Sequence, residues 1–535
     1  MKATEKGVAD STATQVNYAY PWTPDCGDGT YRNPILYADY SDPDVIRHGD
    51  DFWMTASSFN CTPGLPILHS RDLVNWTLVN HALKNVPGDC YNEVQHGCGV
   101  WAPSIRFHAG KFWIFFPTPD EGIYVITADD PRGQWTEPHL VQAGKGLIDP
   151  CPLWDDDGKA YLAHAYAHSR SGLKHKLRVC PMSPDGSRLL GEGQIVFDQP
   201  ERQHTIEGPK FLKRDGWYYL LAPAGGVTTG WQTCLRSRNI FGPYEDRIVL
   251  EQGNTPVNGP HQGGMIATAQ GEWWFLHFQD AGVYGRIVHL QPVEWQDGWP
   301  LIGRDQDGNG IGEPVAHFQK PVAAEVTRLK AERSPCLLTP AATILQTSDE
   351  FTSSKLGLQW QWYANHRDEW HSLTARPGWL RLYAQAAPDN DLARMPHLLL
   401  QKFPARAFTV DTQLELSPAE DGDEAGLVVT GGVHTTLALR KCGGECCVIF
   451  RLNGRDQVLV KVPDASARLR VSVGDGGVCR FSVVTGTGVQ HSVPDSFQAV
   501  AGKWIGAKVG VYCSRIGKAG GFADFDYFRF CGELV

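Results

Sequence analysis

A short pattern recurs along the first part of the chain and constrains the fold more than any other feature. Each copy consists of a glycine turn, two aromatic or apolar residues and an apolar strand. The anchoring aromatics, spaced 48 to 60 residues apart, are Trp53, Trp113, Tyr161, Tyr219 and Trp274. This period, uninterrupted by capped helices, is typical of four-stranded propeller blades rather than of one long sandwich. We therefore expect a five-bladed β-propeller at residues 28–314.

The pattern changes after a linker expected at residues 315–345. From SDEF (348–351) onward, alternating strands of 5–8 residues are bounded by Gly, Asp and Asn. Such strands predict a β-sandwich at residues 346–535. Residues 1–27 are then an N-terminal extension, and the fold class is all-β.

Charge and hydropathy limit the partners of the chain. Its formal net charge of −10 leaves no basic excess for binding nucleic acid. No apolar run is long enough to span a membrane, and the N-terminus lacks the apolar core of a secretory signal. Most of the 14 cysteines sit singly in apolar runs, as reduced core residues do. We expect a cytoplasmic protein without nucleic-acid or membrane partners; self-association into a homo-oligomer is left open.

Three carboxylates share one setting. Asp42, Asp149 and Glu207 are each followed within two residues by proline and then by an apolar strand. This places each carboxylate at the start of an innermost strand, where the blades converge on a central funnel. A desolvated carboxylate is costly unless it has a partner or a task. One such residue is ordinary turn chemistry, but three equivalent ones indicate a functional site.

The segments around these carboxylates resemble glycoside hydrolase family 43. The resemblance covers the whole propeller, and the C-terminal half resembles the concanavalin-like β-sandwich of the β-xylosidase-type members. It implies a five-bladed propeller that hydrolyses β-xylosides or α-L-arabinofuranosides with inversion. The matching segments are YRNPILYADYSDPDVIRHGDDFWMTASSF, VWAPSIRFHAGKFWIFF, GLIDPCPLWDDDGKAYLAHA, TIEGPKFLKRDGWYYLL, GPHQGGMI and GRIVHLQPVEWQDGWP.

The resemblance assigns a role to each carboxylate. Asp42 is the expected general base, Glu207 the general acid and Asp149 the residue that orients Glu207 and raises its pKa. An inverting enzyme needs a base and an acid about 6.5–9.5 Å apart. The acid must stay protonated near neutral pH, and repulsion from Asp149 would contribute to that.

The resemblance also implies residues around the carboxylates. Taken alone, each has a plainer interpretation: an ion pair for the arginine, core packing for the histidine and aromatics. The expected substrate-binding residues are Phe59, Trp101, His261, Arg286 and Trp504. Trp504 would reach from the sandwich into the funnel and shorten it, which favours exo attack.

Two further positions carry open questions. Glu350 and Asp526 resemble calcium ligands of such sandwiches, and hard oxygen ligands suit Ca²⁺; a surface acid pair is the alternative. Val227 stands where some xylosidase members have threonine, which leaves the leaving-group contacts open.

These features favour one function over three others. We expect an exo-acting inverting β-xylosidase with α-L-arabinofuranosidase activity that acts on short hemicellulose oligosaccharides and needs no cofactor for its chemistry. A dedicated α-L-arabinofuranosidase acting on side chains is the main alternative. A non-catalytic sugar-binding propeller would have lost a carboxylate, and an endo-acting arabinanase usually lacks the sandwich.

Overall fold

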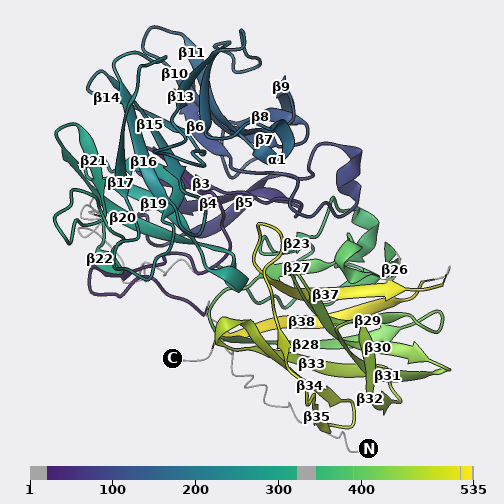
Figure 1. The fold of residues 1–535 in the computed structure, drawn as a ribbon. Coiled ribbons are helices and arrows are strands. Elements are labelled where there is room, and N and C mark those ends of the chain that lie inside the picture. Colours follow the sequence, from purple (N-terminus) through teal and green to yellow (C-terminus); the bar gives the residue numbers. More distant parts are fainter. Residues whose placement is uncertain (1–20, 322–344, 389–390, 518–519, 533–535) are drawn as a thin grey trace, which may run out of the picture.

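The computed structural model describes residues 21–321, 345–388, 391–517 and 520–532 (Figure 1). Two β-rich bodies lie side by side: a propeller, in purple to teal, and a sandwich, in green to yellow. Helices within the described ranges are single turns: α1 (His168–Ser171), η1 (Asp89–Asn92), η2 (Gly282–Tyr284), η4 (Asp368–Trp370), η6 (Leu392–Arg394) and η7 (Asp475–Gly477). The predicted all-β class is confirmed.

The propeller contains five four-stranded antiparallel sheets among the described residues, each made of consecutive strands. Blade 1 comprises β2 (Asp44–His48), β3 (Asp51–Thr55), β4 (Gly64–Ser70) and β5 (Thr77–Leu83). Blade 2 comprises β6 (Ser104–His108), β7 (Lys111–Thr118), β8 (Gly122–Ala128) and β9 (His139–Ala143). Blade 3 comprises β10 (Leu147–Trp154), β11 (Ala160–Tyr166), β12 (Lys176–Met182) and β13 (Gln194–Asp198). Blade 4 comprises β14 (Lys210–Arg214), β15 (Trp217–Ala224), β16 (Trp231–Ser237) and β17 (Glu245–Leu250). Blade 5 comprises β18 (His261–Ala267), β19 (Trp273–Asp280), β20 (Arg286–Gln296) and β21 (Trp299–Ile302).

The recurring sequence pattern forms the same corner in every blade. Its glycine turns from the first strand into the second with positive φ, 77° at Gly110 for example, a conformation that glycine adopts without steric cost. The anchoring aromatic then lies on the second strand and packs between blades. Trp53 is buried in blade 1 and contacts Phe112 of blade 2, with 6.0 Å between ring centroids.

The ring closes although every blade is built only from consecutive strands, so no strand from one end of the propeller completes a blade at the other end. The segment before blade 1 pairs with β20: the Leu36 and Val288 backbones bond each other, and the Tyr40 N–H donates to the Arg286 carbonyl at 3.0 Å. Further out, β1 (Thr30–Arg32) pairs antiparallel with β22 (His317–Gln319). β22 lies in the range expected to be a linker, because the edge of β1 needs a partner for its backbone groups. Residues 322–344 of that range lie outside the described residues.

The sandwich consists of two sheets in the described part of the chain. The first runs, in spatial order, through β23 (Gln361–Trp362), β27 (Leu399–Lys402), β37 (Lys508–Arg515), β29 (Glu424–Thr430), β30 (His434–Cys442), β31 (Glu445–Leu452) and β32 (Arg455–Val462), with β26 (Gln385–Ala386) beside β37. The second runs through β24 (His371–Ser372), β25 (Leu380–Tyr383), β38 (Phe522–Gly532), β28 (Phe408–Ser417), β33 (Ser466–Val473), β34 (Val478–Thr485) and β35 (Gln490–Ser492), with β36 (Phe497–Gln498) beside β34.

Alternation along the strands builds the sandwich core. Every second residue of β28, from Phe408 to Leu416, is buried, as expected for a strand with one face inward. The same apolar cluster includes Tyr37, Tyr284 and Ile287 of the propeller. The two domains therefore share a continuous core.

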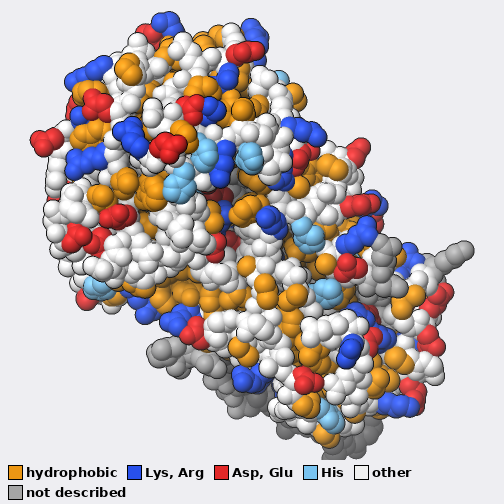
Figure 2. All heavy atoms as spheres, in the orientation of Figure 1, with side chains coloured by type: hydrophobic (Ala, Val, Ile, Leu, Met, Phe, Trp, Pro, Cys, Tyr) orange, Lys and Arg blue, Asp and Glu red, His pale blue; other side chains and the backbone are white. Residues whose placement is uncertain are grey.

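The surface and the thiols agree with the composition. On the face shown in Figure 2, basic and acidic side chains are interspersed. Every cysteine that the structure describes is a free thiol. Within the described ranges, no helix has the length and apolar character needed to cross a membrane.

Candidate active site

The three carboxylates meet in one cavity of about 100 Å³ at the centre of the propeller. Asp42 precedes β2, Asp149 lies within β10 and Glu207 precedes β14. Seven of the eight residues predicted to be catalytic or to contact sugar line this cavity, and His261 is the exception. The lining consists of Asp42, Phe59, Trp101, Ala102, Ile148, Asp149, Glu207, Val227, Gln262, Arg286 and Trp504.

A repeated backbone turn aims these side chains inward. Asp42 and Asp149 have φ of 54° and 58°, and Gly208 and Gln262 have 58° and 43° at the matching places of blades 4 and 5. Non-glycine residues in this region carry strain, which persists only where the surroundings enforce it. The three strained non-glycine residues, Asp42, Asp149 and Gln262, all place a polar side chain in the cavity lining.

Asp42 is held by three donors. The hydroxyls of Ser41 and Ser57 donate to its Oδ2 at 2.7 and 2.5 Å. Arg286 Nη1 lies 3.2 Å from Oδ1 and also donates to the Ser41 hydroxyl at 2.6 Å. These bonds hold the Asp42 carboxylate in place beside Arg286, and such charge-assisted bonds are the stronger kind.

Glu207 has the opposite environment. Burial first, and then the negative charges of Asp149 and Asp42, raise the pKa of Glu207 to about 8. One quarter of its side-chain surface (25 %) is exposed. The carboxyl is therefore protonated at neutral pH and open to a ligand.

The surroundings of Asp149 give it a lower pKa than that of Glu207. Burial and the Asp42 charge raise the pKa of Asp149 to about 7, although the Gly208 N–H, which donates to its Oδ2 at 2.8 Å, and the nearby Lys210 ammonium act to lower it. Because of this hydrogen bond and this positive charge, Asp149 carries the negative charge more readily than Glu207 does. Two nearby carboxyls pushed apart in this way can serve as acid and anion.

The prediction that His261 binds sugar stays a prediction, and the structure places this residue behind the cavity lining. His261 is fully buried and does not line the cavity. A bulge between His261 and Gly263 turns Gln262 to the cavity in its place. His261 Nε2 lies 3.8 Å from Glu207 Oε1, and burial lowers the pKa of the imidazole to about 3, so it stays neutral behind the acid.

Sequence reasoning missed Gln262 and Lys210. Gln262 occupies the blade-5 position that matches Asp42, so aligning the five blade starts would have found it. Lys210 is buried near Asp149, whose pKa its charge lowers, and its ammonium donates to the Ser104 hydroxyl at 2.7 Å and the Pro103 carbonyl at 2.6 Å. A lysine at the start of an apolar strand gave no hint of this role.

Three aromatic side chains form one wall. Trp101 lies 6.5 Å from Phe59 and 6.2 Å from Trp504 between ring centroids. Trp504 belongs to the sandwich, in the loop before β37. Asp39 anchors that loop, because its carboxylate accepts from the backbone N–H groups of both Gly506 and Arg286, at 3.0 and 2.9 Å.

The expected calcium ligands do not fit a metal ion as they are placed. Both carboxylate oxygens of Glu350 accept hydrogen bonds from Arg529, each at 2.7 Å. Asp526 lies close enough for Glu350 to raise its pKa, though less than burial does. Among the described residues, no group of three or more His, Cys, Asp or Glu is arranged to hold a metal.

Comparison with known families places both domains. Residues 31–300 match the family described as glycosyl hydrolases family 43. Residues 348–531 match the beta xylosidase C-terminal concanavalin A-like domain. The chain belongs to glycosyl hydrolases family 43. It is a glycoside hydrolase, and the cavity with its three carboxylates is the candidate active site of this family member.

Relatives and solved structures agree with this membership. A putative beta-xylosidase of Xylanibacter ruminicola is 41 % identical, over 91 % of this chain and 86 % of the relative. A non-reducing end alpha-L-arabinofuranosidase of Bacteroides ovatus is 29 % identical, over 94 % of each chain. The crystal structure of a GH43 protein of Bacillus licheniformis superposes with a TM-score of 0.79 and 25 % identity, covering 94 % of this chain and all of the other.

Proposed function

We propose that this family 43 hydrolase is an exo-acting, inverting β-xylosidase with α-L-arabinofuranosidase activity on short hemicellulose oligosaccharides. One observation carries the proposal: a single cavity joins the Glu207 carboxyl, whose pKa is raised to about 8, the Asp42 carboxylate paired with Arg286, and an aromatic wall. Relatives named beta-xylosidase and alpha-L-arabinofuranosidase align along nearly the whole chain.

The residues divide the chemistry between them. Asp42 takes a proton from a water molecule, whose oxygen attacks the anomeric carbon. Glu207 gives its proton to the glycosidic oxygen, so the leaving alcohol departs neutral. The attacking oxygen enters on the face opposite the leaving group and the configuration inverts. Asp149 keeps Glu207 protonated through charge repulsion, and Arg286 holds Asp42 in place.

Trp504 supports the exo mode. A groove that accepts internal units of a polymer must be open at both ends, whereas Trp504 of the sandwich forms part of the wall of this cavity. His261 and Lys210 are buried beside the carboxylates: His261 lies 3.8 Å from Glu207, and the Lys210 charge lowers the pKa of Asp149. The terminal sugar therefore occupies the bottom of the funnel, and the leaving group faces the mouth.

One observation supports the alternative function, a dedicated α-L-arabinofuranosidase. Val227 lines the cavity, and an apolar side chain there offers no hydrogen bond to a leaving-group hydroxyl. A site that lacks such a bond discriminates weakly between leaving groups.

The test compares nitrophenyl β-D-xyloside and nitrophenyl α-L-arabinofuranoside side by side, with the Glu207→Gln variant as control. We expect both to be cleaved, the xyloside with the higher kcat/KM, and NMR of the fresh product to detect the inverted anomer. Cleavage of the arabinofuranoside alone would establish the alternative function. Retention of configuration would contradict the assigned roles. The homo-oligomer and the cytoplasmic location stay predictions.

A further inference from the structure

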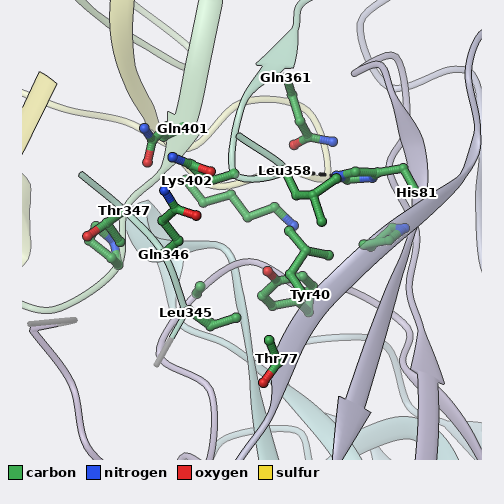
Figure 3. A pocket seen from close by; sticks show the side chains of 15 residues that line it. Tyr40, Thr77, His81, Leu345, Gln346, Thr347, Leu358, Gln361, Gln401 and Lys402 are labelled. Atoms are coloured by element: carbon green, nitrogen blue, oxygen red, sulfur yellow. Dashed lines mark hydrogen bonds between the residues drawn. The ribbon is translucent and has the colours of Figure 1, made fainter. Parts of the chain in front are cut away.

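A second cavity, of about 180 Å³, lies between the propeller and the sandwich (Figure 3). It shares no lining residue with the catalytic cavity. We call it the interface cavity and define it by Tyr40, Leu78 and His81 of the propeller and by Gln359, Gln401 and Lys402 of the sandwich. Nothing in the proposed reaction uses it.

A cation reaches into this cavity. Lys402 leaves β27 and extends toward Tyr40 (Figure 3), with its ammonium 3.7 Å from the ring centroid. Its Nζ donates to the Asp39 carbonyl at 2.5 Å. Of the described residues, none places a carboxylate within ion-pair distance of Lys402. Burial and the neighbouring Lys508 charge lower the pKa of this lysine to about 7, and the Asp39 charge offsets them only in part.

Unpaired polar atoms belong to residues that line the interface cavity. Gln401 Nε2, Gln359 Oε1 and the Thr77 hydroxyl are buried and have no hydrogen-bond partner in the described part of the chain. Gln401 is only 3 % exposed. Buried polar groups are nearly always satisfied, so an unpaired donor and an unpaired acceptor at one cavity indicate a ligand that both accepts and donates. Hydroxyl groups do both.

The remaining walls and the size complete the description. Leu78, Leu358 and Pro66 offer apolar contact to the C–H face of a ring. A cavity of about 150 Å³ accepts a benzene-sized molecule, so this one accepts a single six-membered ring. We propose that the interface cavity binds a hydroxylated carboxylate the size of one sugar ring, with its carboxylate on Lys402 and its hydroxyls on the glutamine amides.

Titration calorimetry on the full chain tests the proposal with three probes. D-glucuronate has the ring, the hydroxyls and the carboxylate; D-glucose lacks the carboxylate, and acetate lacks the ring. We expect saturable binding of glucuronate, with glucose and acetate each at least about tenfold weaker because each lacks one part of the recognised group. This measurement does not depend on which glycoside the enzyme cleaves.

A matched pair of variants locates the binding. Lys402→Met should weaken glucuronate binding at least about tenfold, since a charge-assisted bond is lost. Lys355→Met is the control, because Lys355 is an exposed lysine of the same domain that does not line the cavity. Should Lys402→Met fail to fold, Gln401→Leu takes its place and should weaken binding several-fold.

Four outcomes would overturn the proposal. They are no saturable binding of glucuronate, equal binding of glucose, equal binding of acetate, and unchanged affinity in a folded Lys402→Met or Gln401→Leu variant. The last outcome would place glucuronate in the catalytic cavity or elsewhere.

Discussion

At the scale of single residues, the active site depends on three carboxyl groups that have different hydrogen-bond donors and neighbouring charges. Asp42 receives three donors, Asp149 has the Gly208 N–H and the nearby Lys210, and Glu207 faces the negative charge of both. Protein surroundings shift a pKa through burial, neighbouring charge and hydrogen bonds. Here all three act within one cavity, and their net effect raises the pKa of Glu207 to about 8 and that of Asp149 to about 7.

Removing the base or the acid should abolish most turnover. We expect Asp42→Asn and Glu207→Gln each to lower kcat by about 10²–10⁴-fold, the range contributed by a positioned proton donor or acceptor. Steady-state kinetics with nitrophenyl xyloside measures the loss, and thermal melting verifies that each variant is folded. Near-wild-type turnover in either folded variant would rule out its assigned role.

The pH profile should report the link between Asp149 and Glu207. The acid works only when protonated, so kcat/KM should fall as pH rises through the Glu207 pKa of about 8. Asp149→Asn removes a negative charge that raises this pKa, and the alkaline limb should move to lower pH. Asp157→Asn, an exposed substitution in the same blade, is the control. An unmoved limb in Asp149→Asn would contradict the coupling.

The same shift should cost stability at high pH. The folded-state pKa of Glu207 is raised above its ordinary value of 4.5, so its contribution to stability is present below that value and lost as pH rises through about 8. Glu207→Gln should therefore raise Tm above pH 8 and leave it unchanged in acid. The exposed Glu201→Gln serves as reference. A gain that is the same at both pH values would argue for packing instead.

At the scale of elements, the loop before β37 connects the two domains at the catalytic cavity. A Cβ on Gly506 would lie 2.6 Å from the Gly285 nitrogen and 2.7 Å from the Tyr284 carbonyl carbon, closer than real Cβ contacts. Backbone packs directly against backbone there, next to Arg286. Trp504 is positioned by this contact and by Asp39.

Gly506→Ala should therefore displace Trp504. We expect a several-fold higher KM for xylobiose, because the leaving-group side loses its wall, and a smaller change in kcat. Trp504→Ala should behave alike. Gly474→Ala is the matched control, since its Cβ would meet only the Val478 carbonyl, at an ordinary 3.6 Å. An unchanged KM in Gly506→Ala would show that the position of this loop does not affect substrate binding.

The elements also mark how far the sequence could be interpreted. The glycine–aromatic corners predicted every blade, because each is a local signal repeated five times. The β1–β22 pair escaped prediction, since a three-residue strand paired across nearly the whole propeller leaves no local pattern. For the site, proline after a carboxylate was visible, whereas the bulge that exchanges His261 for Gln262 depends on pairing with β19.

At the scale of the whole molecule, the two domains are joined by backbone as well as by side chains. Thr62 and Trp362 exchange backbone hydrogen bonds of 3.0 and 2.6 Å across the boundary. The Asn365 side chain bonds both backbone groups of Val86, at 2.8 and 2.9 Å. Together with the apolar cluster that spans the boundary, these bonds couple the two domains.

Unfolding should accordingly be one event. We expect calorimetry to detect a single cooperative transition, and Asn365→Ala to destabilise the entire chain by roughly 2–4 kcal/mol, because two buried backbone groups lose their partner. Two transitions that respond separately to this substitution would mean that the domains fold independently.

The single mouth that we propose for the catalytic cavity has a consequence for the order in which the products leave. In a funnel with one mouth, the molecule nearest the mouth must leave before the molecule that lies deeper. The leaving group must dissociate first, and the freed monosaccharide follows it. That sugar is therefore the last product to leave and binds the same empty enzyme as the substrate. The enzyme should slow as its own monosaccharide accumulates, in direct competition with the next oligosaccharide.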